Sequence, residues 1–351
     1  MKVLRTVNGD LPLDSMGITL SHEHVLVDGS QWMVDPVTEN DHQLSSRSPA
    51  MEDMWWLRQW PNTSRTNYLL DDFDLAVQEL GFFAELGGST VIDMTCSSTM
   101  GREIKKLRQI SKNTGINIVA GCGYYVEASH SPQVAMSDAN ELADVLINEI
   151  RIGVDGTEIR AGVIGEIGVS HPITVNEAKC LHAAAIAQKE TGASITVHTA
   201  CDALGAHSAI DAARCLLECG ADLSRVVMGH LDTFAQDVEY LAEIIEMGCS
   251  IAFDLFGNET FHSEYGFAIP GDSEKIRGVV ALCDRGLAGH IFLGHDTAMK
   301  IQLRKYGGYG YGHIIRNIVP RFRLSGLNDQ QINQMLIENP KRMFCVDSIS
   351  A

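Results

Sequence analysis

Hydrophobic and polar positions follow two different periods along this chain from residue 71 onward. Short, mostly apolar runs bounded by glycine or polar residues predict buried strands, and longer stretches with apolar positions three and four residues apart predict amphipathic helices. The predicted strands cover 89–94, 117–121, 161–166, 193–198, 225–230, 249–254 and 290–296. The predicted helices that alternate with them cover 71–86, 102–113, 138–150, 175–190, 206–218, 234–246 and 273–285.

An eighth strand is predicted before this alternation, in the β-prone run Gly17-Ile-Thr-Leu20. Short apolar strands that alternate with helices indicate parallel strands buried on both faces. Eight such units over about 280 residues predict an α/β fold, a (β/α)8 or TIM barrel. A doubly wound open sheet is the alternative, but no glycine fingerprint for phosphate binding follows a strand. We expect residues 1–351 to form one domain, with extra helices near Ile314 and over 329–338.

A long insertion, residues 25–70, separates the first strand from the first helix. It is rich in Ser, Asn and Pro, yet it contains all four tryptophans of the chain, Trp32, Trp55, Trp56 and Trp60. Clustered tryptophans argue against disorder, and irregular segments of this length in compact domains are usually functional. We interpret the insertion either as a lid or pocket wall above a site, or as a subunit interface or a satellite hydrophobic cluster.

Polar side chains occupy the carboxyl ends of the predicted strands, which is where active sites of such barrels lie. Six residues share this location: His22, His24, Glu166, His198, His230 and Asp296. His22 and His24 are two residues apart on a strand, so both point to one face and Glu23 points away. Glu166, His198 and His230 recur at an interval of 32 residues, which places them at equivalent positions on strands 4, 5 and 6. Strand 7 is passed over before Asp296 on strand 8.

These six residues predict a metal centre. Each alone has a structural alternative, such as a core histidine or a helix N-cap, but burying them together without a cation costs several kcal/mol per unpaired charge. The set is too large for one tetrahedral zinc ion and suits two divalent ions about 3.5–4 Å apart. Zinc is expected, with manganese, cobalt or iron as alternatives. We assign one ion to His22, His24 and Asp296 and the other to His198 and His230, with Glu166 and a hydroxide shared.

Four further residues are candidates for supporting roles. Asp232 would orient a metal ligand or Asp296, or else cap the following helix. Tyr125, after strand 3, would donate a hydrogen bond to substrate. Lys300, after strand 8, would recognise an anionic group or else lie in solvent. His262 follows strand 7 and would line the pocket, whereas His295, beside Asp296, is expected to be structural.

The charge balance restricts the partners. With 45 acidic against 27 basic residues and a net charge of −18, the chain is not expected to bind nucleic acid or an anionic membrane. No secretory signal and no apolar run long enough to span a bilayer is apparent. The nine cysteines are scattered without a Cys-x-x-Cys motif, as reduced core cysteines are, and this indicates a cytoplasmic location.

The strand-end residues sit in motifs that resemble the phosphotriesterase family of the amidohydrolase superfamily. The five motifs that carry them are His22-Glu-His24, Gly165-Glu166-Ile-Gly168, Val197-His198-Thr199, Gly229-His230-Leu-Asp232 and Gly294-His-Asp296. Four more support the resemblance: Gly121-Cys-Gly-Tyr-Tyr-Val126, Asp254-Leu-Phe-Gly257, Lys305-Tyr-Gly-Gly308 and Glu338-Asn-Pro-Lys341. The chain is most similar to the phosphotriesterase-related branch, in which glutamate replaces the carboxylated lysine of strand 4, as Glu166 does here. The resemblance weakens in the insertion.

The resemblance implies a binuclear zinc-type hydrolase and a homodimer. Members act on phosphotriesters, on lactones and other carboxylic esters, or on small N-acyl amides such as N-acetyltaurine. We expect a zinc-dependent hydrolase of a carboxylic ester or lactone of a small molecule. A metal-bridging hydroxide would attack the substrate, and Asp296 would accept the proton. An amidohydrolase and a promiscuous phosphotriesterase are the alternatives. A metal-containing binding protein, or a metal-dependent aldolase or isomerase, would belong to another class.

Overall fold

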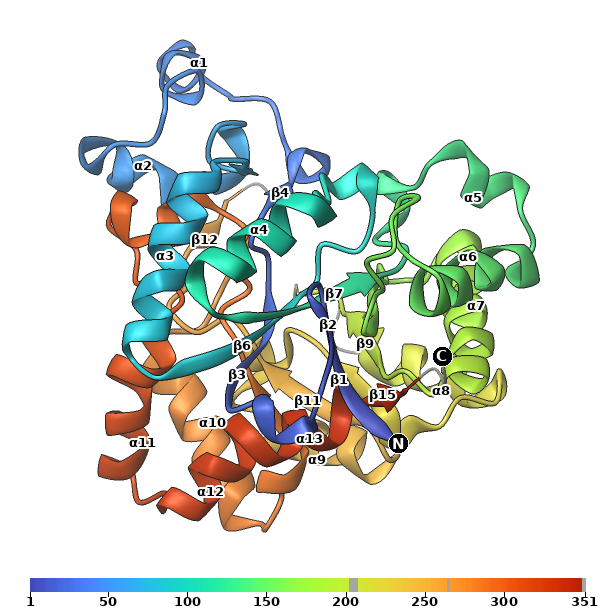
Figure 1. Ribbon diagram of the computed structural model, residues 1–351. Helices are drawn as coiled ribbons and strands as arrows, with labels where there is room; N and C mark the ends of the chain where they lie inside the picture. The colour runs from blue at the N-terminus through green and yellow to red at the C-terminus, as the bar shows by residue number, and fades with distance from the viewer. Residues whose placement is uncertain (202–207, 264–265, 349–351) are drawn as a thin grey trace.

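The computed structural model describes residues 1–201, 208–263 and 266–348, and its centre is a ring of eight parallel strands (Figure 1). In ring order these are β3 (Ile18–Glu23), β6 (Gly88–Asp93), β7 (Asn117–Cys122), β8 (Val163–Gly168), β9 (Ile195–His198), β10 (Val226–Met228), β11 (Ser250–Phe253) and β14 (Ile291–Leu293). The ring closes where Ser21 Oγ donates to the carbonyl of Leu293 at 2.8 Å and the Asp296 N–H donates to the carbonyl of His22 at 3.1 Å. The predicted TIM barrel is therefore confirmed.

Helices connect the strands and cover the outside of the ring. They are α3 (Phe73–Glu85), α4 (Ile104–Thr114), α6 (Ala139–Arg151), α7 (Val175–Thr191), α8 (Ser208–Glu218), α9 (Val238–Glu246) and α10 (Asp272–Asp284), with the short α5 (Pro132–Met136) before α6. Capping residues set their ends: the Thr174 side chain accepts from the Glu177 N–H, and Gly192 ends α7 in the left-handed conformation. Residues 206 and 207 of the predicted helix 206–218 lie outside the described part of the chain.

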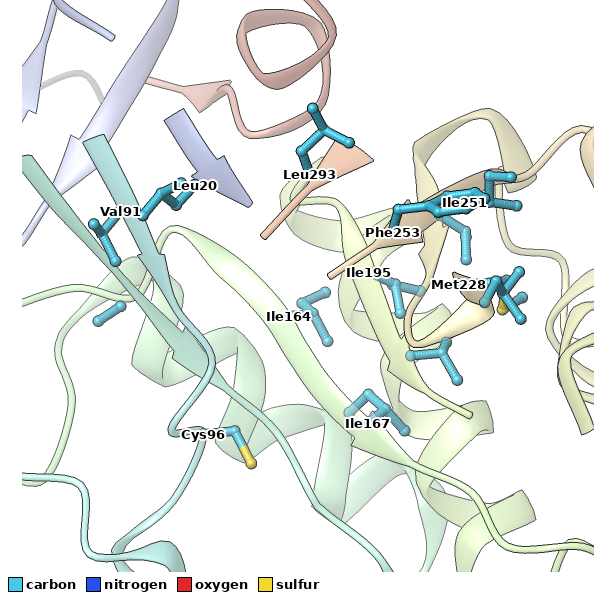
Figure 2. Packing of buried hydrophobic residues seen from close by; sticks show 14 of the residues in the cluster. Leu20, Val91, Cys96, Ile164, Ile167, Ile195, Met228, Ile251, Phe253 and Leu293 are labelled. Atoms are coloured by element: carbon cyan, nitrogen blue, oxygen red, sulfur yellow. The ribbon is translucent and has the colours of Figure 1, made fainter. Parts of the chain in front are cut away.

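Side chains of the strands alternate between two hydrophobic layers, as they do in a closed barrel. In β7, Ile118 and Ala120 pack outward against the helices and Val119 packs inward; in β11, Ile251 and Phe253 pack outward and Ala252 inward. Figure 2 shows outward-packing residues from successive strands, among them Leu20, Val91, Ile164, Ile195, Met228, Ile251 and Leu293. Apolar side chains fill the interior of the barrel below the strand ends, and the histidines and carboxylates described below lie above them, at the carboxyl ends of the strands.

A small antiparallel sheet at the other end of the barrel was not predicted. It contains β1 (Lys2–Thr6), β2 (Gly9–Leu11) and β15 (Val346–Asp347), with β1 paired to both others. Leu4 and Phe344 join the inner hydrophobic layer, and the buried guanidinium of Arg5 makes two hydrogen bonds to Asp10, at 2.9 and 3.0 Å. This sheet closes the interior of the barrel on the side away from the strand-end residues.

The insertion is irregular, as predicted, but it contains short elements and packs its own core. These elements are β4 (Val27–Asp28), α1 (Glu39–Ser45), α2 (Met54–Leu57) and β5 (Leu69–Leu70). Its core is a satellite cluster of Leu44, Met54, Trp56, Leu57, Tyr68, Met299 and Ile301, with Trp32, Met33 and Trp60 packed against it. Three of the four tryptophans, Trp32, Trp56 and Trp60, therefore pack the insertion against Met299 and Ile301 in the loop that follows β14. In Figure 1, α1 and α2 lie outside the barrel.

Three short helices precede β15: α11 (Val319–Leu324), α12 (Asp329–Asn333) and α13 (Asn339–Met343). A π-helical turn at Ile314–Ile318 leads into α11, and another at Gln334–Glu338 joins α12 to α13. The remaining elements are the hairpin strands β12 (Phe261–His262) and β13 (Phe267–Ala268). Within the described ranges, each helix is too short or too polar to cross a bilayer.

Candidate metal centre and substrate cavity

The six polar residues predicted from the strand ends lie together; we call them the strand-end cluster, comprising His22, His24, Glu166, His198, His230 and Asp296. A bulge in β3 helps to place the first two, since Leu20 pairs with Val91 but Glu23 pairs with Asp93, so β3 contains one extra residue there. Bulges of this kind re-aim the side chains that follow. The rings of His22 and His24 lie 5.8 Å apart, and Glu23 points away from them.

Glu166 lies in the middle of the four histidines. Its Oε2 is 3.3 Å from His22 Nε2, 3.4 Å from His198 Nδ1 and 3.8 Å from His230 Nε2. Its Oε1 is 3.4 Å from His24 Nε2. One buried carboxylate therefore faces two imidazoles from the end of β3 and one each from the ends of β9 and β10. The interval of 32 residues predicted equivalent strand-end positions for Glu166, His198 and His230.

Asp296 completes the cluster after β14. Its Oδ1 lies 3.2 Å from His24 Nε2 and 3.6 Å from His22 Nε2. Asp296 and His230 both have positive φ angles, 46° and 60°. A residue with a Cβ rarely adopts this left-handed conformation, and such strain concentrates at functional sites because the surrounding structure must enforce it. The backbone is therefore held in an unusual shape at two of the six positions.

A role in the site was not predicted for Asp254, which directly follows β11. Its Oδ2 lies 3.1 Å from His22 Nδ1, and its Oδ1 lies 3.0 Å from His230 Nδ1. Strand 7 was expected to supply no metal ligand, and its terminal carboxylate instead contacts two histidines of the cluster. The signal was present in the sequence as an aspartate at the end of the predicted strand 249–254. Similarly, Thr95 Oγ1 lies 2.9 Å from His24 Nδ1.

Burial and opposite charges set the protonation of the cluster. Burial alone would lower the pKa of His22, but the carboxylates of Asp254 and Glu166 outweigh it and raise this pKa to about 9. For His24, the contacts with Asp296 and Glu166 likewise outweigh burial and raise the pKa to about 10. Burial would raise the pKa of Glu166, but the surrounding histidines hold it well below its ordinary value. Without a cation, protons on the imidazoles must supply the positive charge that the carboxylates require.

The donor set fits bound metal ions. Potential ligand atoms form two groups, and within each group all of the atoms lie within 4.8 Å of one another. One group comes from His22, Glu166 and His230, and the other from His22, His24 and Asp296. Two buried atoms of the cluster, His22 Nε2 and Glu166 Oε2, have no hydrogen-bond partner. Imidazole nitrogens and carboxylate oxygens are ligands of zinc and related ions. The group of His22, His24 and Asp296 is the same as one predicted ligand set. The group of His22, Glu166 and His230 differs from the other predicted set, because it contains His22 in place of His198. His198 nevertheless lies close by, with its Nδ1 2.8 Å from His230 Nε2.

A cavity of about 310 Å³ opens beside the cluster. His24, His198 and Asp296 reach it from the cluster, and the insertion contributes Val27, Gly29, Gln31, Trp32, Asn62 and Tyr68. Apolar residues from loops after the strands form much of the remaining wall, namely Met100, Val126, Val169, Leu255, Phe267, Ile269 and Met299. The insertion is therefore both a satellite hydrophobic cluster and a wall of the cavity. Among the described lining residues there is no lysine or arginine.

Two of the predicted supporting residues line this cavity. The Tyr125 hydroxyl lies 3.2 Å from His198 Nδ1 and accepts a hydrogen bond from Trp32 Nε1 at 3.1 Å. His262 Nδ1 lies 3.0 Å from Asn62 Oδ1, and its ring stacks on Phe267 with centroids 4.9 Å apart. Both residues thus connect the insertion with the barrel at the cavity wall.

The other two lie elsewhere. Lys300 lines a separate small pocket with Asp71, Asp72 and Tyr311 instead of the central cavity. Asp232 Oδ2 accepts a hydrogen bond from the backbone N–H of Leu255 at 2.8 Å. It therefore holds the backbone next to Asp254, rather than a side chain of the cluster or the start of the next helix. His295, expected to be structural, bonds Glu23 on the outer side of β3.

Comparison with known proteins agrees with this geometry. An N-acetyltaurine hydrolase of Salmo salar is 38% identical over 342 residues, with 97% of each chain covered. A resiniferatoxin-binding protein of Rhodobacter sphaeroides has a similar structure, with a TM-score of 0.94, 36% identity and coverage of 98% of this chain and 94% of that one. A lactonase of Listeria monocytogenes has a TM-score of 0.80, 25% identity and coverage of 99% and 100%. Residues 2–344 match the phosphotriesterase family as a whole. The chain therefore belongs to the phosphotriesterase family of hydrolases, as the strand-end motifs indicated.

Proposed function

We propose that this protein hydrolyses a carboxylic ester or lactone of a small, largely apolar molecule. The observation that carries the proposal is the cavity beside the strand-end cluster. Its walls are mainly apolar and aromatic, and no lysine or arginine is among its described lining residues. A substrate with an anionic group away from the strand-end cluster would lose water there without gaining a lysine or arginine partner. A neutral acyl compound would instead gain the burial of its apolar surface.

We further propose that His22, His24 and Asp296 hold one divalent ion and that His198 and His230 hold a second, with Glu166 between them. Bound divalent ions, of which zinc is our choice, would lower the pKa of water to supply hydroxide and would polarise the scissile carbonyl. Glu166 supports this assignment, because its two oxygens face histidines of both proposed sets. Asp254 lies against the Nδ1 side of both rings, in a hydrogen bond with His230 at 3.0 Å and in contact with His22 at 3.1 Å, so that the Nε2 atoms are directed toward Glu166.

The residues around the reacting bond have separate tasks in this proposal. Asp296 accepts the proton of the attacking water at its carboxylate and passes it to the leaving oxygen. Tyr125, whose hydroxyl already accepts from Trp32 Nε1, donates to an oxygen of the substrate. His262 and the insertion shape the wall that receives the apolar part. Lys300 has no part in substrate recognition here, because it faces another pocket.

Hydrolysis of an N-acyl amide is the second candidate. It is favoured by the N-acetyltaurine hydrolase relative, which is 38% identical over nearly the whole chain. The same cluster would serve, since esters and amides are both opened by attack on a carbonyl carbon. The two candidates differ in what the cavity must accommodate, because N-acetyltaurine carries a negative charge.

A substrate panel tests the proposal. We would measure kcat/KM of the metal-loaded enzyme for lactones and aryl esters with alkyl chains of increasing length, for N-acetyltaurine and N-acyl amino acids, and for an aryl dialkyl phosphotriester. We expect the esters and lactones to be the best substrates. Their kcat/KM should rise about fourfold with each added methylene until the cavity is full, because each buried methylene contributes about 0.8 kcal/mol.

A higher kcat/KM for N-acetyltaurine than for every ester would overturn the proposal in favour of the amide, and a preference for the phosphotriester would overturn it in favour of that class. Absence of turnover together with tight binding of panel compounds would indicate a binding protein. The Asp296→Asn variant gives the background rate in each assay. A homodimeric assembly and a cytoplasmic location remain proposals from the sequence.

A further inference from the structure

Glu23, the last residue of β3, lies between His22 and His24 but points out of the cluster, and its side chain is fully buried. Its Oε1 accepts hydrogen bonds from the backbone N–H of His295 at 2.8 Å and from the ring of His295 at 2.6 Å. Its Oε2 accepts from the backbone N–H of Thr297 at 3.1 Å. One carboxylate therefore binds the backbone on both sides of Asp296.

We propose that Glu23 is a positioning residue that holds Asp296 against His22 and His24. The inference rests on the proposed function in one respect, that Asp296 binds a cation and accepts a proton. The geometry does not depend on that assumption. Both backbone polar groups of Asp296 are also hydrogen-bonded. Its N–H donates to the His22 carbonyl, and its carbonyl accepts from Gln302 Nε2 at 2.9 Å.

The hydrogen-bond network defines which ring nitrogen of His295 carries the proton. Its Nε2 accepts from the backbone N–H of Ile314 at 3.2 Å, so the ring proton lies on Nδ1 and is donated to Glu23. Three donors thus converge on the carboxylate of Glu23, and none of its oxygens is left unpaired. A carboxylate that accepts several hydrogen bonds forms stronger bonds than a neutral acceptor of the same shape.

The hydrogen bonds between Glu23 and the backbone on both sides of Asp296 matter because the backbone of Asp296 has an unfavourable conformation. The residue has a φ angle of 46°, a conformation that residues with a Cβ rarely adopt and that the surroundings must enforce. Fixing the peptides before and after it keeps Asp296 Oδ1 at 3.2 Å from His24 Nε2. Since Glu23 is the residue between His22 and His24, the same short stretch of β3 supplies two cluster residues and sets the position of a third.

Glu79 offers a matched control, because its carboxylate binds the backbone of the same loop after β14. It is also buried, on α3, and its carboxylate accepts from two consecutive backbone N–H groups, those of Arg304 at 3.2 Å and Lys305 at 3.1 Å. Its contacts lie several residues beyond Asp296. Glu79→Gln therefore reproduces the loss of a buried carboxylate clamp without touching the backbone at Asp296.

The experiment compares Glu23→Gln and Glu79→Gln in the full chain. Metal-free protein is titrated with Co²⁺, whose visible d–d absorption reports ligand geometry, and kcat and KM are then measured on the best ester of the panel. For Glu23→Gln we expect an altered Co²⁺ spectrum, about 10-fold weaker binding of one equivalent, and a kcat lower by about 100-fold with KM nearly unchanged. Glu79→Gln should match wild type in spectrum, Co²⁺ affinity and kcat, whatever its thermal stability.

The proposal is overturned if Glu23→Gln and Glu79→Gln give the same Co²⁺ spectrum and the same kcat, because Glu23 would then be only a structural residue. If Glu23→Gln does not fold, His295→Ala is used instead, because it removes one of the three donors and should alter the spectrum and kcat in the same direction by a smaller factor. If wild type hydrolyses no panel compound, the proposed function fails, while the Co²⁺ spectra still decide the role of Glu23.

Discussion

Nδ1 of His22 lies 3.1 Å from a carboxylate oxygen of Asp254. This contact fixes the plane of the imidazole and, when Nδ1 carries the proton, leaves Nε2 directed toward Glu166, 3.3 Å away. Asp254 makes the corresponding contact with His230, so one carboxylate sets two rings that reach the cluster from different strands. Residues that orient metal ligands in this way affect metal affinity strongly without touching the metal.

We therefore expect Asp254→Asn to weaken metal binding by about 10- to 100-fold. The amide would keep the shape of the side chain but would lose the charge that holds both imidazoles. Competition with a chromogenic chelator measures the affinity. Asp272→Asn is the control, because Asp272 forms a similar buried pair with His313, at 2.7 Å, away from the cluster. Equal affinities in the two variants would contradict the prediction.

Asp296→Asn should lower kcat by about 10²- to 10⁴-fold, which is the usual contribution of a general base. KM should change little, because the cavity walls remain intact. Steady-state kinetics on the best ester gives both values. Asp232→Asn is the comparison, since an amide oxygen can still accept from the Leu255 N–H, and its kcat should stay close to that of wild type. A fully active Asp296→Asn variant would remove Asp296 from the mechanism.

Removal of metal should abolish activity and lower thermal stability together. A ligand at 100 times its dissociation constant stabilises the folded state by about 2.7 kcal/mol, so the melting temperature should rise when Zn²⁺, Mn²⁺ or Co²⁺ is added to chelated protein. Elemental analysis of the reconstituted enzyme should give two equivalents per chain. One equivalent with full activity would contradict the binuclear assignment.

His262 makes the protein sensitive to acid. Burial lowers the pKa of His262 to about 4, whereas a histidine in an unfolded chain titrates near 6.5. Between these values the unfolded chain binds a proton that the folded one excludes. The stabilisation is therefore complete above about pH 6.5 and is lost as the pH falls toward 4. We expect His262→Gln to lose less stability across this range, by a difference approaching about 3 kcal/mol.

Urea unfolding between pH 4 and pH 8 provides the measurement. The quantity compared is the slope of the free energy of unfolding against pH, not its absolute value. His42→Gln is the matched control, because His42 is an exposed histidine of the insertion. Its stability should follow the wild-type pH dependence. Parallel curves for His262→Gln and His42→Gln would show that the burial of His262 is not responsible.

The neighbouring tryptophans Trp55 and Trp56 should differ sharply in their effect on stability. Trp56 is 2% exposed within the satellite cluster, whereas Trp55 is 66% exposed. Trp56→Ala should destabilise the protein by about 3–5 kcal/mol, which is typical for removing a buried aromatic ring. Trp55→Ala should change stability by about 0.5 kcal/mol or less. Equal losses in denaturant unfolding would mean that Trp55 is covered in the native assembly.

The barrel and the strand-end cluster could be predicted because both depend on local pattern. Buried parallel strands are continuous apolar runs, and the interval of 32 residues relates Glu166, His198 and His230 before any contact is known. Asp254 has the same position at the end of its strand, but its role depends on reaching His22 and His230 at once. That is a property of the closed ring and not of either segment alone.

Other features depend on long-range pairing or on loop direction. The sheet of β1, β2 and β15 joins Lys2 to Asp347, and neither segment has a pattern that specifies the other. Lys300 follows β14, as an active-site residue would, yet its side chain lines a pocket next to α3. Proximity to a strand end identifies a loop, whereas the packing of that loop decides which of its residues face the cavity.

Among the residues that the structure describes, the two groups that could hold a cation include no residue of the insertion that walls the cavity. Sequence change in residues 27–68 can therefore alter the size and polarity of the space for substrate while the groups that would activate water stay in place. Selection, or a directed library confined to this segment, could thus change the compounds accepted without rebuilding the catalytic machinery. Divergence of substrate range within such a fold would then be concentrated in this insertion and in the other loops that line the cavity.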